Sequence, residues 1–317
     1  MTTRLLLALL LLPTIARATD ANYKPGPEAE PQADVPKGAL TKHRLETSQV
    51  FPDTFRDFWV YVPAGAKPGA ALPVMVFFDG HWYIDPKAAV RVPIVLDNLI
   101  AKRDIPAIAA VFVNPGAHKD KQPPDGKWRA DNRSFEYDTL HDLNARFVID
   151  ELLPAAEKAS GATFSKDPDA RAICGMSSGG IAAFTVAWER PDAFRKVVSH
   201  IGSFTGIAYR PGKDGQPLRP GGDLYPTLIR KTPVKPLRIF LQDGSNDLDN
   251  EHGHWFLANQ QMLAALHYAN AKADKEKSTG PRYDVHHVWG EGLHSPKHGG
   301  MIFPDTLRWI WRDYKTN

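Results

Sequence analysis

The sequence predicts an α/β domain with a mostly parallel central sheet and helices on both of its faces. Short apolar runs alternate along the chain with segments in which apolar residues have helical spacing, the pattern of a parallel α/β protein. Some of these runs, such as 73–78, are continuously apolar, which is typical of strands buried on both faces. Hydrophobic residues make up 43% and charged residues 24% of the 317 residues, so the chain can bury a full core.

The individual elements follow from these patterns. The apolar runs predict strands at 40–50, 55–62, 73–78, 107–113, 170–174, 196–201, 237–241 and 283–289. Helical spacing predicts helices at 87–102, 135–158, 179–189, 255–271 and 304–314, with Pro154 bending or ending the second of them. Two long irregular segments, 114–132 and 203–223, are rich in Gly and Pro, and we expect them to form functional walls or lids.

The first 18 residues have the pattern of a secretory signal peptide. Arg4 precedes the apolar run 5–12, and a small-residue Ala-x-Ala site follows at 16–18. The run is too short to span a bilayer comfortably, which disfavours a membrane anchor. We therefore expect a cleaved signal at 1–18, an extended lead-in at 19–39 and one domain at 40–317, located in the periplasm or outside the cell.

Cysteine content and charge exclude several classes of protein. The single cysteine, Cys174, cannot form an internal disulfide, so an exported domain must depend on its core, and we expect the thiol to be a buried apolar filler. Without Arg4 and Arg17, 37 basic and 36 acidic residues remain. A net charge of +1 gives no reason to expect a nucleic acid or an acidic membrane surface as partner. The oligomeric state stays open.

The predicted strand 170–174 leads directly into Gly-Met-Ser-Ser-Gly-Gly at 175–180, and a helix follows. This is the G-x-S-x-G motif in the strand–turn–helix context that gives it chemical meaning. Gly175 and Gly179 leave room for a sharp turn at Ser177, and the helix directs its first N–H groups toward the serine, which suits a developing oxyanion. The motif predicts that Ser177 is a nucleophile. The alternative is a glycine-rich turn without chemistry.

A nucleophilic serine needs a base, and the base needs an acid that orients it. In open α/β sheets these residues follow in the order serine, acid, histidine. Asp247 comes after the predicted strand 237–241, and His294 comes after the strand 283–289, each through a loop that contains glycine. We predict that His294 accepts the Ser177 proton and that Asp247 fixes the tautomer of His294.

Other residues compete for both roles. Asp249 is the main rival for the acid, whereas Asp243 ends its strand and is expected to hold the loop through turn bonds. His287 lies inside a predicted strand and is expected to be packed structurally. His298 opens the final helical region, where it caps the helix or lines the site.

An oxyanion hole needs two N–H donors. We predict one from Ser178, the residue after the nucleophile, and the other from the loop that follows strand 73–78. In this loop Gly80 allows a close approach of the backbone, which indicates the N–H of His81 or Trp82 as the second donor. Together with Tyr83, these side chains would form a wall of the pocket. The alternative is an aromatic turn that anchors the core.

Signals for metals and cofactors are weak. Glu251-His252-Gly253-His254 lacks a second group at zinc-like spacing and is expected to start a helix. His286 and His287 alternate in a predicted strand, so they face opposite sides. Neither G-x-G-x-x-G nor G-x-x-x-x-G-K occurs. We expect no metal and no organic cofactor.

Five motifs follow one another along the chain: Phe-Phe-Asp-Gly at 77–80, Asn-Arg-Ser-Phe-Glu-Tyr-Asp at 132–138, Gly-Met-Ser-Ser-Gly-Gly at 175–180, Gly-Ser-Asn-Asp at 244–247 and Gly-Glu-Gly-Leu-His at 290–294. Together they resemble the putative-esterase family of α/β-hydrolases, which includes esterase D, enterochelin esterases and feruloyl esterases. The resemblance extends from about residue 40 to the C-terminus. It implies the α/β-hydrolase fold and hydrolysis of carboxylic esters through an acyl-enzyme.

The resemblance also implies roles for particular residues. The Gly-x-Asn-Asp pattern of the feruloyl branch places the acid on Asp247. Arg133, Glu136 and Tyr137 are expected near the pocket, with Arg133 and Glu136 forming an ion pair. The loop 203–223 matches no motif of the family.

The main expectation is thus an exported serine esterase that acts on small-molecule or glycan-linked esters of polar or aromatic type, such as feruloyl or acetyl sugars. Aromatic residues are expected to line its cleft: Trp82, Tyr83, Trp128, Phe204 and Trp255. Three alternatives stay open, namely a periplasmic esterase of siderophore trilactones, a sugar acyltransferase, and a catalytically silent hydrolase-fold module that binds a glycan or a partner.

Overall fold

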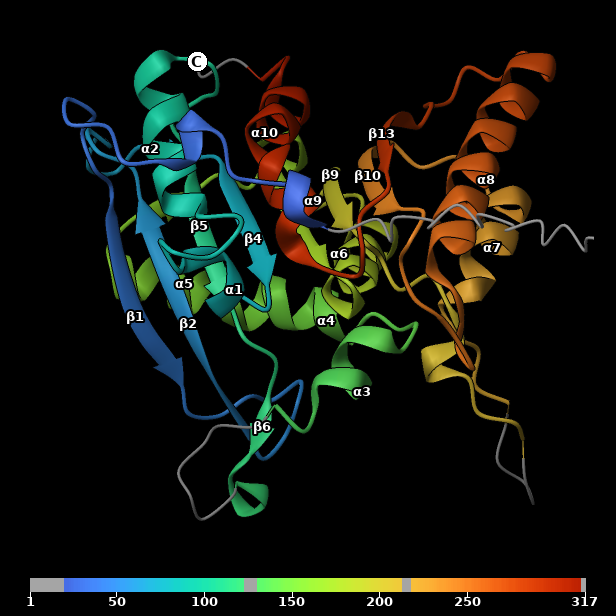
Figure 1. Ribbon diagram of the computed structural model, residues 1–317. Helices are drawn as coiled ribbons and strands as arrows, with labels where there is room; N and C mark the ends of the chain where they lie inside the picture. The colour runs from blue at the N-terminus through green and yellow to red at the C-terminus, as the bar shows by residue number, and fades with distance from the viewer. Residues whose placement is uncertain (1–19, 123–129, 213–217, 315–317) are drawn as a thin grey trace, which may run out of the picture.

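The computed structural model describes residues 20–122, 130–212 and 218–314. Within them, a mixed nine-stranded sheet has the order β1-β2-β5-β4-β8-β9-β10-β13, and β6 pairs with β2 (Figure 1). β1 and β2 are antiparallel to their neighbours, and the strands from β5 to β13 are parallel. The predicted mostly parallel sheet is confirmed. The strands are β1 (Ala39–Leu45), β2 (Thr54–Val62), β4 (Val74–Phe78), β5 (Ala109–Val113), β6 (Ala117–His118), β8 (Arg171–Met176), β9 (Lys196–His200), β10 (Arg238–Gly244) and β13 (Asp284–Gly290).

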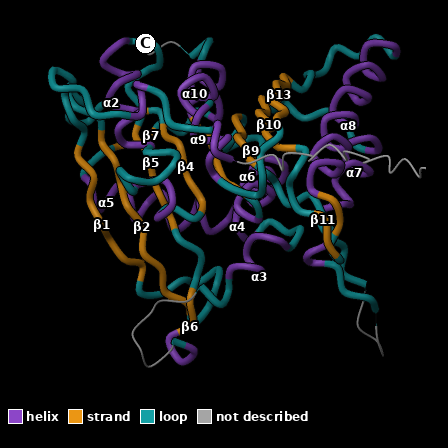
Figure 2. Tube along the Cα trace, viewed as in Figure 1, coloured by secondary structure: helices purple, strands orange, loops and turns teal. Residues whose placement is uncertain are grey.

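Helices cover both faces of this sheet (Figure 2). One core forms under α5 (Leu153–Ser160), α6 (Ser178–Glu189) and α8 (Trp255–Lys275), and α7 (Tyr225–Lys231) packs on α8. The other core forms under α1 (His81–Ile84), α2 (Val92–Lys102) and α10 (Phe303–Trp311). Every residue of the central strands β4, β5, β8 and β9 is buried, because these strands are covered on both sides.

The helix predicted at 135–158 is divided, so that prediction is wrong in part. The structure has α3 (Arg133–Asp138), a break at 139–142, and then α4 (Leu143–Arg146), which continues through a π-helical turn (Phe147–Leu152) into α5. At the break, the Asn144 side chain donates a hydrogen bond to the carbonyl of Glu136, which takes the place of a helical donor. Pro154 lies in the first turn of α5 and does not end the helix. The wider π turn before it accommodates the proline, which has no N–H to donate.

Several short elements were not predicted. The segment after β9 contains 3-10 turns at Gly206–Ala208 and Gly222–Leu224 before α7, and α9 (Pro296–Met301) precedes α10. Two small strand pairs join β3 (Ala71–Leu72) to β7 (Thr163–Phe164) and β11 (Asp249–Asn250) to β12 (Gly253–His254). Parts of both long loops, 123–129 and 213–217, lie outside the described residues, as does the predicted signal peptide.

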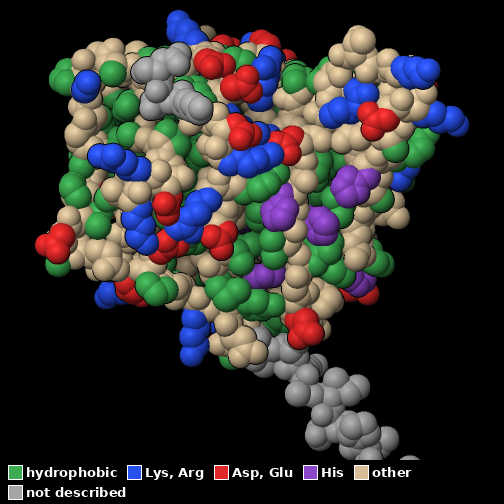
Figure 3. All heavy atoms as spheres, turned by 90° about the horizontal axis from the view of Figure 1, so that it is seen from above, with side chains coloured by type: hydrophobic (Ala, Val, Ile, Leu, Met, Phe, Trp, Pro, Cys, Tyr) green, Lys and Arg blue, Asp and Glu red, His purple; other side chains and the backbone are tan. Residues whose placement is uncertain are grey.

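The surface agrees with the low net charge. On the face seen in Figure 3, Lys and Arg side chains are interspersed with Asp and Glu, and no broad area of one sign is present there. Among the described helices, none combines the length and the apolar character needed to cross a bilayer.

Candidate active site

Ser177 lies on a strained turn between β8 and α6. Its φ is 56° and its ψ is −124°, a conformation that costs a non-glycine residue about 1–3 kcal/mol and persists only where the surroundings enforce it. The backbone N–H of Ser177 donates to the His200 carbonyl (3.0 Å), and the Ser177 carbonyl accepts the N–H of Ser203 (3.1 Å). A Cβ at Gly175 would lie 2.0 Å from the carbonyl oxygen of Gly179, so the turn requires glycine there.

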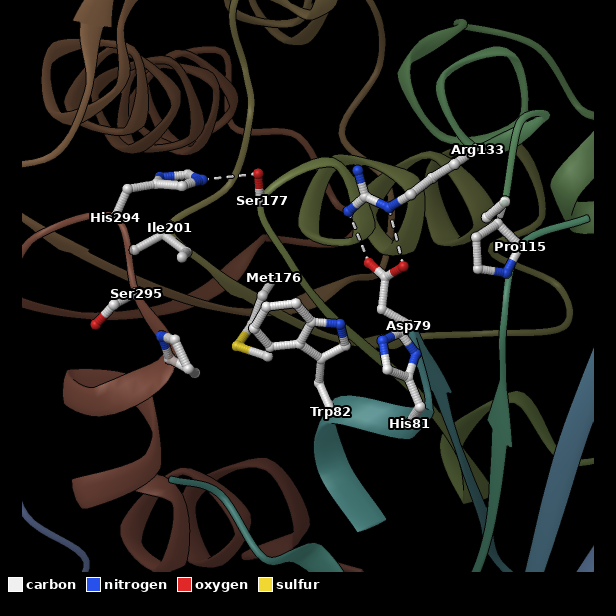
Figure 4. A pocket seen from close by; sticks show the side chains of 12 residues that line it. Asp79, His81, Trp82, Pro115, Arg133, Met176, Ser177, Ile201, His294 and Ser295 are labelled. Atoms are coloured by element: carbon white, nitrogen blue, oxygen red, sulfur yellow. Dashed lines mark hydrogen bonds and ion pairs between the residues drawn. The ribbon is translucent and has the colours of Figure 1, made fainter. Parts of the chain in front are cut away.

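Three side chains predicted from distant parts of the sequence meet at this turn. Ser177 Oγ lies 2.9 Å from His294 Nε2, and His294 Nδ1 lies 2.5 Å from Asp247 Oδ1 (the first contact is drawn in Figure 4). Asp247 is nearly fully buried and also accepts the N–H of Leu248 at 2.5 Å. The three groups therefore form a continuous hydrogen-bonded chain from hydroxyl to carboxylate.

Glycines allow the acid loop and the histidine loop to come together. A Cβ at Gly244 would lie 2.2 Å from the carbonyl oxygen of Gly292, so the backbones of the two loops are in direct contact. Ser245 N–H donates to the Gly290 carbonyl (2.8 Å), and the Asn246 side chain donates to the Glu291 carbonyl (2.8 Å). These bonds fix Asp247 relative to His294.

The competing candidates have other contacts. Asp249 is exposed in β11, and His287 lies on β13. His298 is buried and its Nδ1 lies 2.9 Å from Gln242 Nε2. Asp243 is fully buried beneath Asp247 and accepts hydrogen bonds from the Gly244 N–H and from Asn259 Nδ2, both at 2.7 Å. None of these four contacts the Ser177 hydroxyl.

Asp243 has an unusual protonation state for a carboxyl group. Burial, and next the hydrogen bond and the charge of Asp247, raise the pKa of Asp243 to about 9. Asp243 is therefore neutral at physiological pH and carries a proton to donate. The Oδ2 atom of Asp247 is buried and accepts no N–H, which makes it the acceptor for that proton.

Ser203 was not identified from the sequence, although it follows β9 at the same edge of the sheet. Its hydroxyl oxygen is buried, 3.2 Å from Ser177 Oγ and 3.0 Å from Trp255 Nε1. Because an indole N–H only donates, the Ser203 oxygen accepts from Trp255 and its own proton is left for Ser177 Oγ. The edge of the Trp255 ring also packs against His294, with the centroids 5.8 Å apart.

A cavity of about 350 Å³ opens beside Ser177 (Figure 4). Of the residues predicted for the pocket wall, His81, Trp82 and Arg133 line the cavity, and the Trp82 side chain is half-exposed. The lining is mainly apolar and consists of Asp79, His81, Trp82, Pro115, Ala130, Arg133, Met176, Ser177, Ile201, His294, Ser295 and Pro296.

The charged part of this cavity wall is an ion pair. Arg133 Nε and Nη2 donate to the two carboxylate oxygens of Asp79 at 2.9 and 2.7 Å. Burial opposes the charge on Arg133, yet the hydrogen bonds and attraction of Asp79 leave the pKa of Arg133 raised above its ordinary value. Such a bidentate pair holds the guanidinium in one orientation at the cavity. The expected pairing of Arg133 with Glu136 is wrong.

The predicted oxyanion donors differ in their availability. The N–H of Ser178, at the first position of α6, has no acceptor within the helix. In the other loop, the N–H of Trp82 donates to the Asp79 carbonyl (3.0 Å) and that of Gly80 to the Val113 carbonyl (3.0 Å). The N–H of His81 donates to the side-chain oxygen of Asn114 at 3.2 Å.

Most of the other predicted pocket residues are buried away from the cavity. Glu136 accepts two hydrogen bonds from the buried Arg56, at 2.7 and 3.0 Å. Tyr137 supports the site indirectly, because its hydroxyl accepts the N–H of Asp79 (3.3 Å). The expected aromatic cleft is thus largely wrong for the described residues, and Trp128 lies outside them. The buried residues that do not line the cavity are Tyr83, Glu136, Tyr137, Phe204 and Trp255.

The remaining candidate ligands have structural contacts. His254 caps α8 and accepts the N–H of Leu257 (3.4 Å). Cys174 is buried, 3.6 Å from the Tyr83 hydroxyl, and burial raises the pKa of its thiol to about 12. The described residues contain no group of three or more His, Cys, Asp or Glu side chains placed to hold a metal ion.

Comparison with known proteins assigns the family. The family model described as "Putative esterase" matches residues 51–295. The chain belongs to this esterase family. The resemblance that the sequence motifs indicated is thereby confirmed.

Among curated proteins, the Iron(III) enterobactin esterase of Dickeya dadantii (strain 3937) is 28% identical over 265 residues, which cover 81% of this chain and 52% of that protein. The esterase-family chain therefore spans about half the length of this relative.

Solved structures confirm the α/β-hydrolase fold. The enterobactin esterase from Shigella flexneri, solved with 2,3-dihydroxy-N-benzoyl-serine, has a TM-score of 0.62 at 21% identity, covering 89% of this chain and 62% of that chain. The ferulic acid esterase of Anaeromyces mucronatus, in complex with ferulic acid, has a TM-score of 0.63 at 16% identity, covering 90% of this chain and 94% of that chain.

Proposed function

We propose that this chain is an exported serine carboxylic-ester hydrolase in which Ser177, His294 and Asp247 form the triad. The observation that carries the proposal is the hydrogen-bonded chain from Ser177 Oγ through His294 to Asp247, next to a cavity. Membership of the esterase family supports the same reaction class. Residues 40–317 form the catalytic domain of the proposal.

Acylation uses the triad in its observed orientation. Ser177 Oγ attacks the ester carbonyl carbon while its proton passes to His294 Nε2, 2.9 Å away. Asp247 accepts the Nδ1–H and stabilises the imidazolium that forms. Collapse of the tetrahedral intermediate breaks the bond between carbon and the alcohol oxygen, and His294 returns the proton to the departing alcohol. Water then attacks the acyl carbon with the same base, and Ser177 leaves with its proton restored.

The oxyanion is held by backbone N–H groups in this proposal. Ser178 supplies one donor from the N-terminus of α6. His81 is a better second donor than Trp82, because its N–H bonds to the movable Asn114 side chain, whereas that of Trp82 closes a backbone turn. The substrate oxygen would replace the Asn114 oxygen as acceptor of the His81 N–H.

The cavity suits one polar or aromatic acyl arm. Its volume of about 350 Å³ lies at the lower end of the range for small-molecule sites, so the rest of a larger ester would remain outside. Trp82, Met176 and Ile201 offer apolar contact, and Arg133 offers a fixed positive group. Feruloyl or acetyl esters of sugars fit this description, with no metal or organic cofactor required.

Hydrolysis of a siderophore trilactone is the second candidate. The specific support is the relative named as an Iron(III) enterobactin esterase, which aligns with 81% of this chain. A panel of methyl ferulate, acetylated xylan and enterobactin, compared by kcat/KM, distinguishes the two candidates. Export to the periplasm or the medium rests on the Ala-x-Ala signal pattern and is tested by N-terminal sequencing of the protein recovered from each cell fraction.

The decisive test of the reaction is a Ser177→Ala variant assayed with p-nitrophenyl acetate. We expect kcat to fall by at least about 10³-fold and labelling by a fluorophosphonate probe to disappear. Ser245→Ala is the matched control, because Ser245 lies exposed at the same edge without contacting Ser177. Turnover that persists after the change at Ser177 would reject a mechanism based on this serine.

A further inference from the structure

We propose that Asp20 and Tyr23 are positioning residues for the reaction, because they hold the loop that carries His294 in place. This inference rests on the proposed function. The two residues belong to the segment 20–30, called here the N-terminal strap, which runs beside α9 and on toward α2 (Figure 1). The sequence indicates only an extended lead-in for this part of the chain.

Asp20 contacts the residues on both sides of His294. Its Oδ1 accepts the backbone N–H of Leu293 at 2.9 Å, and its Oδ2 accepts the Ser295 hydroxyl at 2.5 Å. The Asp20 carboxylate is nearly fully buried, so these bonds are little weakened by water. One carboxylate therefore fixes the backbone before His294 and the side chain after it.

Tyr23 bonds to the same loop nearer to the end of β13. Its hydroxyl accepts the N–H of Glu291 at 2.9 Å, and its ring stacks on His298 with a centroid distance of 4.3 Å. Two glycines make room for it. A Cβ at Gly290 would lie 2.6 Å from the Tyr23 hydroxyl, and a Cβ at Gly292 would lie 3.4 Å from the Tyr23 ring. Because the two glycines of the Gly-Glu-Gly-Leu-His motif have no side chains, they leave the space that Tyr23 of the strap occupies.

The far end of the strap is anchored to the body of the domain. Asn98 on α2 donates to the carbonyls of Glu28 and Glu30, at 2.7 and 2.9 Å. The Glu28 carboxylate pairs with Lys102 (2.8 Å) and with Arg308 of α10. The strap is therefore tied to the fold at one end and to the His294 loop at the other. It begins two residues after the predicted processing site, so removal of 1–18 leaves it complete.

This arrangement affects catalysis because two backbone N–H groups of the loop after β13, those of Glu291 and Leu293, both donate to the strap just before His294. His294 must keep its Nε2 in reach of Ser177 while its Nδ1 stays on Asp247, and an error of about 1 Å costs on the order of 10²-fold in rate. Loss of the strap contacts should lower the fraction of molecules with a correctly placed imidazole. Asp20 bonds to one residue of the cavity lining, Ser295, whereas the proposed apolar contacts for the substrate, Trp82, Met176 and Ile201, belong to other parts of the fold, so KM should change less than kcat.

The experiment compares Asp20→Ala, Asp20→Asn, Tyr23→Phe and the control Glu28→Ala in the full-length chain with p-nitrophenyl acetate. We expect Asp20→Ala to reduce kcat about 10- to 100-fold with KM within about twofold. Asp20→Asn keeps an oxygen that accepts the Leu293 N–H, so it should recover part of this loss. Tyr23→Phe removes only the hydroxyl and keeps the stack on His298, so its effect should be smaller.

Glu28→Ala separates positioning from stability. It breaks ion pairs of the same strap but keeps the bonds of Asn98 to the Glu28 and Glu30 carbonyls, which continue to anchor the strap, and it touches no residue of the His294 loop, so it should lower Tm without lowering kcat at 25 °C. The inference is overturned if Asp20→Ala keeps kcat within twofold of the wild type, or if Glu28→Ala loses as much kcat as Asp20→Ala. The proposed function fails separately, if the wild-type chain shows no turnover that depends on Ser177.

Discussion

Asp243 provides the sharpest test of the electrostatics beneath the site. It is fully buried, and its pKa of about 9 compares with an ordinary value of 3.8. Between these two pH values the native state holds one proton more than the unfolded chain. Each pH unit in this range therefore lowers the free energy of unfolding by about 1.4 kcal/mol. The contribution of neutral Asp243 to the free energy of unfolding is fully present below pH 3.8 and is lost progressively as the pH rises toward 9.

Asp243→Asn removes this titration. We expect the free energy of unfolding of the variant, relative to the wild type, to rise by about 4 kcal/mol between pH 5.5 and pH 8.5, which follows from three pH units at about 1.4 kcal/mol each. The new amide places an N–H₂ group against Asn259 Nδ2, which also donates, and this mismatch costs stability. This cost is the same at each pH. It therefore changes the difference in the free energy of unfolding between the variant and the wild type, but not the way in which that difference varies with pH.

Urea unfolding at pH 5.5, 7.0 and 8.5, followed by tryptophan fluorescence, measures the slope. Asp249→Asn is the control, because it removes an exposed carboxylate from the same loop and should give a difference independent of pH. Parallel stability curves for the wild type and Asp243→Asn would mean that Asp243 is ionised in the native state. In that case Asp247 Oδ2 has no proton donor beneath it and the account of the buried pair is refuted.

Three further changes test other parts of the site. Ser203→Ala removes the hydroxyl that donates to Ser177 Oγ and should lower kcat roughly fivefold at unchanged KM, since one hydrogen bond is worth about 1 kcal/mol; an unaltered kcat would show that the Ser203 hydroxyl does not assist Ser177. Gly244→Ala places a Cβ 2.2 Å from the carbonyl oxygen of Gly292 and should cost about 1–3 kcal/mol in urea unfolding, together with most of the esterase activity; full activity would show that the loops need not touch. Cys174, with its pKa raised to about 12 by burial, should resist a thiol-specific disulfide reagent at pH 8 in the native state and react at once in guanidinium; rapid native labelling would contradict its burial.

The sequence was sufficient for the sheet and for the relative positions of the three triad candidates. Ser177, Asp247 and His294 each follow an apolar strand, and the carboxyl ends of parallel strands lie at one edge of a sheet. Once the strands were recognised, convergence of these residues followed from topology alone. The need for glycine at 175 could be explained in advance for a different reason, since the geometry of the turn depends on local sequence.

Partners of the polar residues could not be predicted, because they are separated by long stretches of chain. Arg133 was expected to pair with its neighbour in sequence, Glu136, but α3 directs Arg133 to Asp79, 54 residues away, and leaves Glu136 to Arg56, 80 residues away. Both pairings depend on how α3 packs against the sheet. The break in the helix after residue 138 was missed because the apolar residues keep helical spacing across it, and it is marked only by the local hydrogen bond of the Asn144 side chain to the Glu136 carbonyl.

The site contains two features that each lower the stability of the folded protein, and the surrounding contacts prevent them from relaxing. The backbone of Ser177 is strained, and the buried pair Asp243 and Asp247 must share a proton in a place that water does not reach. No interaction at the site itself offsets these two unfavourable terms. Packing in the two cores on either side of the sheet offsets them, and it holds the strand ends at fixed positions. His294 is different, since it lies on a loop beyond the end of β13, outside both cores. A loop in that position needs restraints of its own, which is why we expect the bonds of Asp20 and Tyr23 to affect the rate of reaction more than the stability of the fold.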